Sequence, residues 1–311
     1  MDLAGSRIVV TGGAGFVGSH LVEHMVEHAR VAVVDDLSTG HREWVPDDAE
    51  FHEGDVREPS ILDSVLDPSV DLVCHLAAGK TVDTADPRGQ FEANTAATYT
   101  VLESMADADV ENLLYTSSST VYGEAPRPTP EDFGPLEPIS AYGAAKVAEE
   151  GLVSTYAHSH DLRARVVRFA NIVGPRLRGA VIPDFVQKLN DNPEQLRILG
   201  DGRQEKSYMH VSDCVAAMSH VIRAADDDYD VYNLGTQTTT SVTEIADIVA
   251  DVMGVDPSYA YTGGDRGWTG DVPRMRLDVE KLESLGWTPQ LESVAAVERA
   301  ARELVPELAE Q

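Results

Sequence analysis

The sequence predicts an α/β fold of the doubly wound class, with a parallel sheet covered by helices on both faces and a smaller C-terminal lobe. Two observations lead to this prediction. A short apolar run at 7–11 enters a glycine-rich turn and a helical pattern, and a second run at 31–35 completes a βαβ unit, which implies parallel strands and a right-handed crossover. Further apolar runs then alternate with helical patterns, as in a Rossmann-type sheet.

Each element of this first part follows from a local pattern. RIVVT at 7–11 and VAVVD at 31–35 are rich in β-branched residues, which favour strands. Between them, apolar residues recur at helical spacing over 16–26. Three more strands are expected at 71–77, 112–117 and 165–169.

The pattern changes after residue 175, where prolines and glycines punctuate shorter elements. A strand at 231–235, a helix at 242–253 and a last helix ending near residue 307 are expected there. The two predicted parts are a Rossmann domain over 1–175 with elements returning near 208–240, and a lobe made of 176–207 and 241–311.

The charge of the chain excludes one class of partner. Its 53 acidic and 24 basic residues give a formal net charge of -29, so nucleic acid, which carries the same sign, is not an expected ligand. Only five residues are lysine, and aspartate outnumbers glutamate. This composition is typical of a halophilic surface, because strong salt screens the self-repulsion of carboxylates. An ordinary, moderately acidic cytosolic protein remains the alternative.

Cysteines and targeting signals indicate a cytoplasmic protein. Cys74 and Cys214 lack the spacing of a zinc site or a disulfide framework, so we expect both to be reduced and buried, and no metal site is predicted. The N-terminus lacks the basic and apolar regions of a signal peptide, and no apolar run approaches the roughly 18 residues of a membrane span.

The glycine-rich turn predicts a dinucleotide site. Residues 12–18 fit G-x-x-G-x-x-G between a strand and a helix, where glycine allows a tight turn and the close approach of backbone N–H groups to a pyrophosphate. Asp35 ends the next strand, 17 residues after Gly18, near the roughly 20 expected for a ribose-binding acid. Its carboxylate, with Asp36 beside it, favours NAD over NADP, because it would repel a 2′-phosphate.

A tyrosine and a lysine form a candidate acid–base pair. Tyr142 and Lys146 are four residues apart, hence on one face of a helix. A nearby ammonium and a cationic nicotinamide would stabilise a phenolate and lower the pKa of Tyr142 into the range of a general base. Upstream, YTSSSTVYG at 115–123 supplies hydroxyls that could donate to a substrate oxygen.

These motifs resemble those of the extended short-chain dehydrogenase/reductases, in particular the NAD-dependent nucleotide-sugar epimerase/dehydratase family, and most closely its UDP-glucose 4-epimerase-like members. The similarity runs nearly from end to end. The matching segments are TGGAGFVGS at 11–19, GDV at 54–56, HLAAGK at 75–80, YTSSSTVYG at 115–123, YGAAK at 142–146, RFANIVGP at 168–175 and GDGRQEKSYMHVSD at 200–213.

The resemblance implies the residues of the site. Tyr142 would be the proton acceptor, Lys146 its partner and Ser118 the catalytic hydroxyl. The NAD contacts would be Gly12, Gly15, Phe16, Val17, Asp35, Asp36, Leu37, Asp55, Val56, Leu76, Ala77, Ala78, Lys80, Asn94, Ser117, Tyr142, Lys146 and Phe169, with Asp55 facing the adenine amino group. The substrate contacts would be Lys80, Ser118, Ser119, Thr120, Tyr142, Asn171, Val181, Ile182, Gln204, Tyr208 and Arg266, with Asn171 and Arg266 at the diphosphate.

Two departures from the family pattern bear on function. Dehydratases carry an Asp-Glu pair directly after the catalytic threonine, and UDP-xylose-forming decarboxylases carry a glutamate just before VYG. Ser119 and Thr120 stand there instead, which argues against dehydration because elimination of water needs a further acid and base. Lys206 replaces the usual arginine, which keeps the charge but loses bidentate phosphate recognition.

The resemblance therefore implies NAD-dependent epimerisation of a nucleotide sugar at C4, of the UDP-glucose/UDP-galactose type, through a transient 4-keto sugar. The alternatives are a reductase, dehydrogenase or dehydratase of the same superfamily and, less in keeping with the intact motifs, a non-catalytic NAD-binding regulator. The expected partner is a nucleoside-diphosphate sugar, with a UDP-sugar favoured, and no membrane partner is expected. A homodimer formed through helices near 94–105 and 142–156 is also implied.

Overall fold

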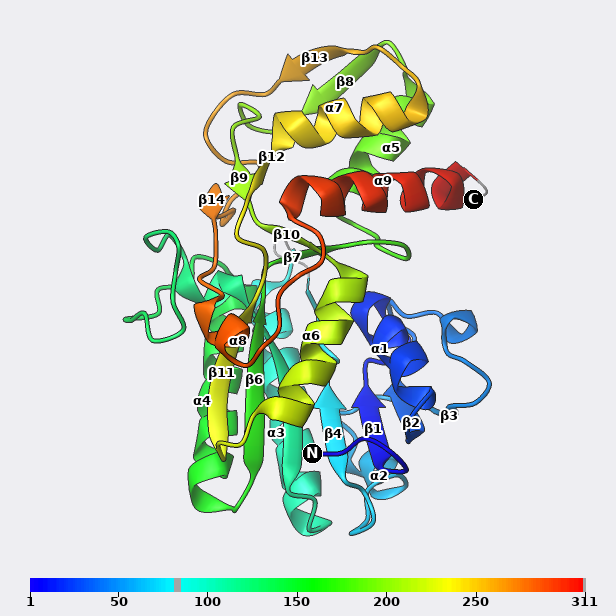
Figure 1. Ribbon diagram of the computed structural model, residues 1–311, viewed down its shortest axis with the longest axis vertical. Helices are drawn as coiled ribbons and strands as arrows, with labels where there is room; N and C mark the ends of the chain where they lie inside the picture. The colour runs from blue at the N-terminus through cyan, green and yellow to red at the C-terminus, as the bar shows by residue number, and fades with distance from the viewer. Residues whose placement is uncertain (81–84, 310–311) are drawn as a thin grey trace.

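The computed structural model describes residues 1–80 and 85–309. Within these residues, seven strands form one sheet in the order β11-β6-β5-β4-β1-β2-β3 (Figure 1). All six pairings in it are parallel, which confirms the predicted fold class. The strands are β1 (Arg7–Thr11), β2 (Arg30–Asp35), β3 (Glu50–Glu53), β4 (Leu72–His75), β5 (Asn112–Ser118), β6 (Arg163–Phe169) and β11 (Tyr229–Leu234).

Alternating side chains of the central strands pack into cores on opposite faces of the sheet. In β1, Ile8 and Val10 belong to one core and Val9 to the other, as the two-residue period of a strand requires. Both faces are therefore buried, which explains why the strands are continuous apolar runs rather than alternating ones.

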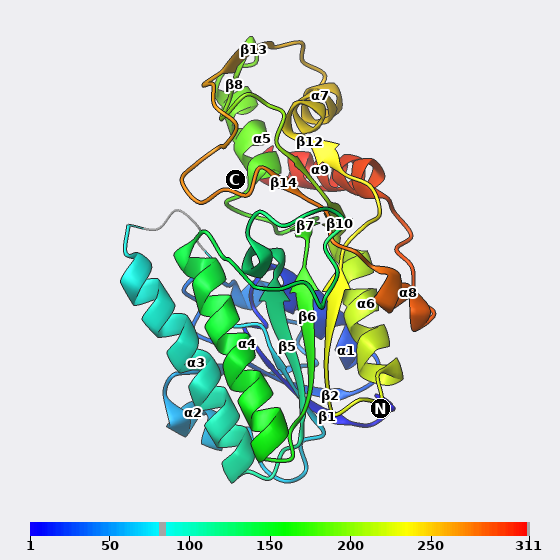
Figure 2. The same ribbon diagram turned by 90° about the vertical axis from the view of Figure 1, so that its left-hand side faces the viewer.

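Helices cover each face (Figure 2). The first core includes residues of α1 (Phe16–Val26) and α6 (Val211–Ala224), and the second includes residues of α2 (Pro59–Asp63), α3 (Pro87–Asp107) and α4 (Ala141–Ser159). None of the helices described is long and apolar enough to cross a membrane. Cys74 and Cys214 are free and buried, one in β4 and one in α6, as predicted.

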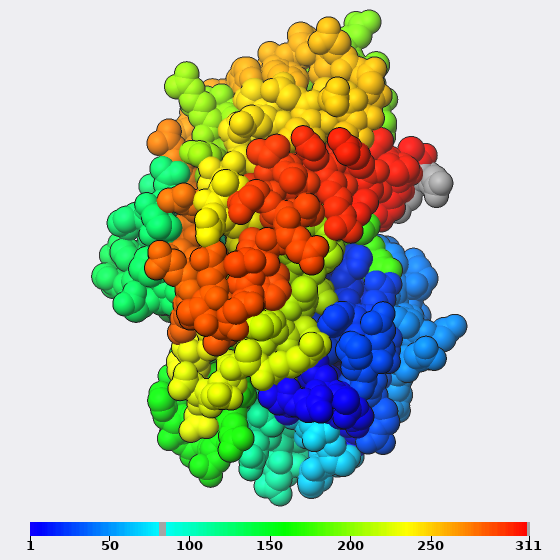
Figure 3. Space-filling view, in the orientation of Figure 1, coloured from blue at the N-terminus to red at the C-terminus, as the bar shows by residue number. Residues whose placement is uncertain are grey.

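A second group of elements stands beyond the carboxyl ends of the strands (Figure 1). Its core joins α5 (Val181–Asp191), α7 (Val242–Met253) and α9 (Ser293–Ala309). Its short strands form two pairs, β8 (Gln195–Ile198) with β13 (Ser258–Tyr261) and β10 (Tyr208–His210) with β7 (Asn171–Val173), and one three-stranded sheet in which β9 (Glu205–Lys206) lies between β12 (Thr240–Ser241) and β14 (Arg274–Met275). In Figure 3 the red C-terminal helix crosses the upper half of the visible face.

Local sequence explains the ends of α7. Ser241 and Glu244 form a reciprocal capping box at its start, and Gly254 ends it with φ 68°, a left-handed conformation that glycine adopts without steric cost. The predicted helix at 242–253 is thus confirmed. The remaining short elements are α8 (Glu280–Ser284) and the 3₁₀ helices η1 (Arg42–Trp44) and η2 (Ser119–Tyr122).

Candidate active site

The glycine turn lies between β1 and α1 and has no room for side chains. Gly12 has φ +72°, and a Cβ there would lie 2.6 Å from the backbone nitrogen of Ala77. A Cβ on Gly18 would lie 2.0 Å from the carbonyl oxygen of Gly12. Gly15 is the N-cap of α1 and has no side chain to cap it. The turn therefore leaves an open backbone cradle at a helix N-terminus, which suits a pyrophosphate.

Substituting Gly12 by alanine is expected to weaken NAD binding at least tenfold and to destabilise the protein. The left-handed φ alone costs about 1–2 kcal/mol for an L-residue, and the clash with Ala77 adds to it. NAD released by acid from the purified protein, and urea unfolding, measure the two effects. Gly151→Ala in α4 is the matched control, since its Cβ would meet nothing within 4 Å; equal behaviour of the two variants would contradict the prediction.

Asp35 ends β2 with both carboxylate oxygens held in place. One accepts from the backbone nitrogen of Ala14 and the other from that of Leu37, each at 2.9 Å. Burial raises the pKa of Asp35, and these two backbone hydrogen bonds lower it. Each oxygen retains a further acceptor site, so the fixed carboxylate can still accept hydrogen bonds from the hydroxyls of a ribose.

Other predicted cofactor residues gather along the same edge of the sheet. Leu76, Ala77 and Ala78 directly follow β4, and the Asn94 side chain clasps the next residue, donating to the Gly79 carbonyl at 3.0 Å and accepting from its nitrogen at 2.8 Å. Asn94 thus fixes the segment that follows β4, and both its amide oxygen and its amide nitrogen are hydrogen-bonded to the backbone of Gly79. Asp55 is bound by the Arg57 guanidinium, whose hydrogen bond lowers the pKa of Asp55.

The three predicted catalytic residues come from β5 and α4. Ser140 caps α4 by accepting from the Gly143 nitrogen at 3.0 Å, which places Tyr142 in the first turn. A Cβ on Gly143 would lie 2.8 Å from the Thr120 carbonyl, so the helix packs tightly against the segment that follows Ser118. The Lys146 ammonium lies 5.9 Å from the centroid of the Tyr142 ring.

Burial decides the acidity of Tyr142. The side chain keeps some exposed surface, but the protein packed around it raises its pKa; Lys146 and hydrogen bonding with Ser118 lower the pKa, and Glu149 raises it. Sequence reasoning credited Lys146 with lowering this pKa and did not include burial or Glu149. In the protein without cofactor, these effects together raise the pKa of Tyr142, so the phenol form is favoured. Formation of the phenolate therefore needs the positive charge of the cofactor as well as that of Lys146.

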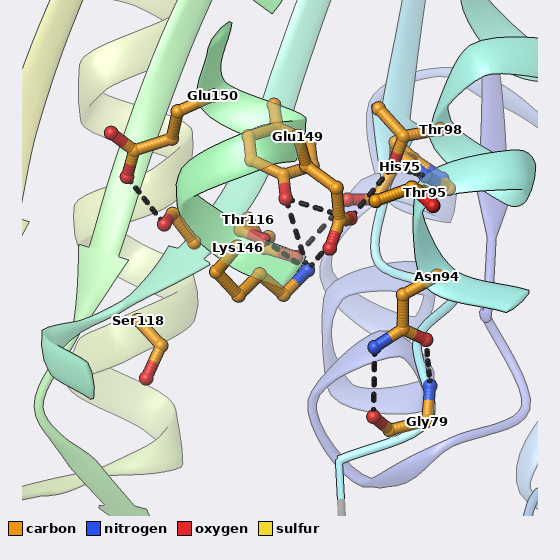
Figure 4. Close-up of polar contacts among 12 residues, drawn as sticks. His75, Gly79, Asn94, Thr95, Thr98, Thr116, Ser118, Lys146, Glu149 and Glu150 are labelled. Carbon is orange, nitrogen blue, oxygen red and sulfur yellow. Dashed lines mark hydrogen bonds and ion pairs between the residues drawn. The ribbon is translucent and has the colours of Figure 1, made fainter. Parts of the chain in front are cut away.

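The hydroxyl cluster divides into two sets. Ser117 turns away from the Ser118 side and donates to Glu150 at 2.5 Å. The Ser118 oxygen accepts from the Thr120 hydroxyl at 3.0 Å and from its backbone nitrogen at 3.2 Å, which leaves its own proton for another acceptor. Figure 4 shows Ser118 apart from the buried contacts of Lys146.

The predicted substrate residues beyond the sheet are not all at the surface. Asn171 and Val181 are partly exposed, whereas Gln204 and Tyr208 are buried and Ile182 has no exposed surface. Ile182 packs in the core of α5, α7 and α9, so its side chain does not line an open pocket. The amide nitrogen of Gln204 donates to the Leu199 carbonyl at 3.1 Å.

Two cations near this region are paired with acids that the sequence did not single out. Lys206 donates to the buried Asp271 at 2.6 Å and lies 5.2 Å from the centroid of the Trp268 ring. Arg266 forms an exposed ion pair with Glu124 and donates to the Asp271 carbonyl at 3.2 Å. Lys206 and Asp271 are 65 residues apart, so no local pattern could have joined them.

The fold and the site together define a class of protein: a dinucleotide-dependent enzyme of the short-chain dehydrogenase/reductase type, with a Ser-Tyr-Lys set beside a glycine cradle. The chain belongs to the NAD dependent epimerase/dehydratase family, which its residues 8–235 match. The predicted family and the NAD cofactor are thereby confirmed.

Known relatives fit this assignment along the whole chain. The UDP-glucose 4-epimerase of Lactobacillus helveticus is 30% identical over 93% of each chain. A crystal structure of a UDP-galactose 4-epimerase is 43% identical, with a TM-score of 0.89, and covers 97% of this chain and 99% of its own. The UDP-glucose 4-epimerase of Thermotoga maritima, solved with UDP-glucose, is 30% identical with the same TM-score and coverage. These names agree with the predicted 4-epimerase activity.

Proposed function

We propose that this enzyme interconverts the C4 epimers of a nucleotide sugar of the UDP-glucose/UDP-galactose type. The observation that carries the proposal is the placement of Ser118, Tyr142 and Lys146 together at the carboxyl edge of the sheet, the edge at which the glycine turn follows β1. NAD, when bound, supplies a reversible acceptor for the hydride of C4. Gly12 and Gly15 would hold its pyrophosphate and Asp35 its adenosine ribose.

The residues of the chain manage the proton at O4 of the sugar. Tyr142 takes the proton from the 4-hydroxyl as C4 is oxidised and returns it when C4 is reduced. Ser118 donates a hydrogen bond to the same oxygen, since its own lone pairs face Thr120. Lys146 stabilises the phenolate electrostatically. Because the sugar is both oxidised and reduced at one carbon, no net change of cofactor results.

The carboxyl groups near the site favour epimerisation over dehydration. Glu149 and Glu150 on α4 lie behind the catalytic residues, but they are bound to Lys146 and Arg168, respectively. The positions that follow Ser118 carry hydroxyls. Neither arrangement supplies the extra acid–base pair that elimination of water requires.

We assign the nucleotide sugar to the lobe of residues 176–207 and 241–311. Arg266 is the ligand that we propose for its diphosphate, because the exposed ion pair with Glu124 is weak in water and can yield to a dianion. The acidic charge of the chain supports a salt-adapted surface, and we further propose that the protein is a cytoplasmic homodimer. Its contact would use α3 and α4; Phe91 and Tyr99, both on α3, are 37% and 44% exposed.

The proposed function is tested by incubating the purified protein at high salt with UDP-glucose, UDP-N-acetylglucosamine, UDP-glucuronate and UDP-xylose separately. NMR of the anomeric region follows the configuration at C4, and absorbance follows NADH. A C4 epimer formed without stoichiometric NADH is the expected result. Stoichiometric NADH would instead identify a dehydrogenase, and no change of any of the four sugars would refute the proposal.

Arg266→Met is expected to raise the KM for the nucleotide sugar about tenfold and to change kcat by less than threefold. A diphosphate contact remote from C4 contributes equally to the ground state and the transition state. Steady-state epimerase kinetics measure both constants. Arg163→Met is the control and should leave KM unchanged. It removes an exposed arginine that pairs with Asp228 at the amino end of β6, the end of the strand away from the site. An unchanged KM in Arg266→Met would remove Arg266 from the site.

A further inference from the structure

Glu149 is a fully buried carboxylate directly behind the catalytic lysine. Its side chain has no exposed surface. One oxygen, Oε2, accepts from the Thr98 hydroxyl at 2.7 Å, from the Tyr115 hydroxyl at 2.8 Å and from the Lys146 ammonium at 3.3 Å (Figure 4). The other, Oε1, is buried without a hydrogen-bond partner among the described residues. A buried carboxylate with one oxygen unsatisfied is costly, so stability alone does not account for this residue.

Three contacts engage the three N–H donors of the Lys146 ammonium. It donates to the Tyr115 hydroxyl and to the Thr116 carbonyl, each at 3.1 Å, and to Glu149. Tyr115 and Thr116 belong to β5, whereas Glu149 lies one helical turn beyond Lys146 on α4. The carboxylate thus fixes the ammonium between helix and strand, on the face of α4 that also carries Tyr142.

Lys146 and Glu149 are the two opposite charges that act on Tyr142, because the other titratable groups packed around them are neutral or paired. From β4, His75 contacts the Thr98 hydroxyl at 3.1 Å and the Thr11 hydroxyl at 2.6 Å. Burial, and secondly Lys146, lower the pKa of His75 to about 3, so it is neutral. From β5, burial and Glu149 raise the pKa of Tyr115 well above 10, so it is neutral too. Glu150 is paired with Arg168.

We propose that Glu149 is a positioning residue for the reaction: its buried carboxylate anchors the ammonium of Lys146 and offsets the effect of that ammonium on Tyr142. The proposal rests on the proposed function only for its kinetic consequence. Tyr142 would then remain a phenol in the protein alone and become a base when the positive charge of the cofactor arrives, which confines proton abstraction to the loaded enzyme.

The direction of the electrostatic effect can be worked out. Lys146 lowers the pKa of Tyr142 and Glu149 raises it. Glu149→Gln removes the negative charge and leaves Lys146 unopposed, so the pKa of Tyr142 should fall. If Glu149 only stabilised the fold, its replacement would lower the free energy of unfolding without moving the titration of Tyr142.

The test is a pH titration of the NAD-loaded enzyme, labelled with ¹³C at Cζ of tyrosine and observed by NMR. The resonance missing in Tyr142→Phe identifies Tyr142. We expect the midpoint of Tyr142 to lie at lower pH in Glu149→Gln than in the wild type. The double variant Arg168→Met/Glu150→Met, which removes a buried carboxylate from the same helix without leaving Arg168 unpaired, is the matched control and should leave the midpoint in place. If Glu149→Gln does not fold, Glu149→Met removes the charge with a side chain of similar volume and should move the midpoint in the same direction.

A kinetic readout accompanies the titration. For each enzyme, kcat is expressed as a fraction of its own plateau at high pH. One pH unit below the wild-type midpoint, this fraction should be about threefold larger in Glu149→Gln than in the wild type, with little change in KM. An unmoved or higher midpoint, or an equal shift in Arg168→Met/Glu150→Met, would overturn the proposal. If the wild type epimerises none of the sugars, the proposed function fails, yet the NMR titration still decides the role of Glu149.

Discussion

Replacing Tyr142 by phenylalanine is expected to lower kcat about 10²–10⁴-fold, the usual contribution of a general acid–base. The ring remains in the first turn of α4, but no group is left to take the proton from the 4-hydroxyl. NAD content and the circular dichroism spectrum should match the wild type, because Gly12, Gly15 and Asp35, which would hold the pyrophosphate and the adenosine ribose, are unchanged and the loss of one hydroxyl removes only one of the expected NAD contacts.

Epimerase rates by anomeric NMR measure this loss. Tyr259→Phe serves as the matched control: its hydroxyl donates to Asp247 at 2.7 Å in the distant β13 and α7 pair, and its removal should leave kcat within twofold. Retention of more than a tenth of the wild-type kcat by Tyr142→Phe would show that another group carries the proton.

Arg168→Met is expected to destabilise the protein by about 3–5 kcal/mol, because it leaves a buried carboxylate without its partner. Arg168 donates twice to Glu150, at 2.9 and 2.6 Å, and also to the Tyr122 hydroxyl at 2.7 Å. Both members of the pair are buried, with 6% and 7% of their side-chain surfaces exposed. Urea unfolding at constant salt measures the change.

The double variant Arg168→Met/Glu150→Met separates the ion pair from simple packing. With both charges removed, no buried charge is left unpaired, so the double variant should be more stable than Arg168→Met alone. Arg163→Met, which breaks an exposed pair, should cost less than about 1 kcal/mol. A loss of similar size in Arg163→Met and Arg168→Met would contradict this account.

Much of the site was predictable because its signals are local. The glycine turn, Asp35, and the Tyr142 and Lys146 pair each lie within one or two adjacent elements, where the spacing of residues fixes their relative placement. Ser118 followed from the family motif around it. The edge strand β3 was missed, because its sequence EFHE has a single apolar residue and so no strand pattern.

The acids of the site were not predictable. A glutamate in a helix normally faces solvent, and nothing near Glu149 in the sequence indicates that α3 and β5 will close over it. Asp271 and Glu124 likewise meet Lys206 and Arg266 only through contacts between distant segments. Ile182 shows the converse: the family motif placed it in the pocket, and the packing of α5 against α7 and α9 buries it.

The sequence by itself determined the fold class, the cofactor and the family, and it supplied the proposed catalytic set, because each depends on short-range spacing and on residue chemistry. Only the tertiary structure decided which charges face the catalytic groups. The acidity of Tyr142 is the clearest case, since it depends on burial and on Glu149 as well as on Lys146. Electrostatic effects depend on distances in space and on exclusion of water, and both arise when helices and strands far apart in the chain pack together.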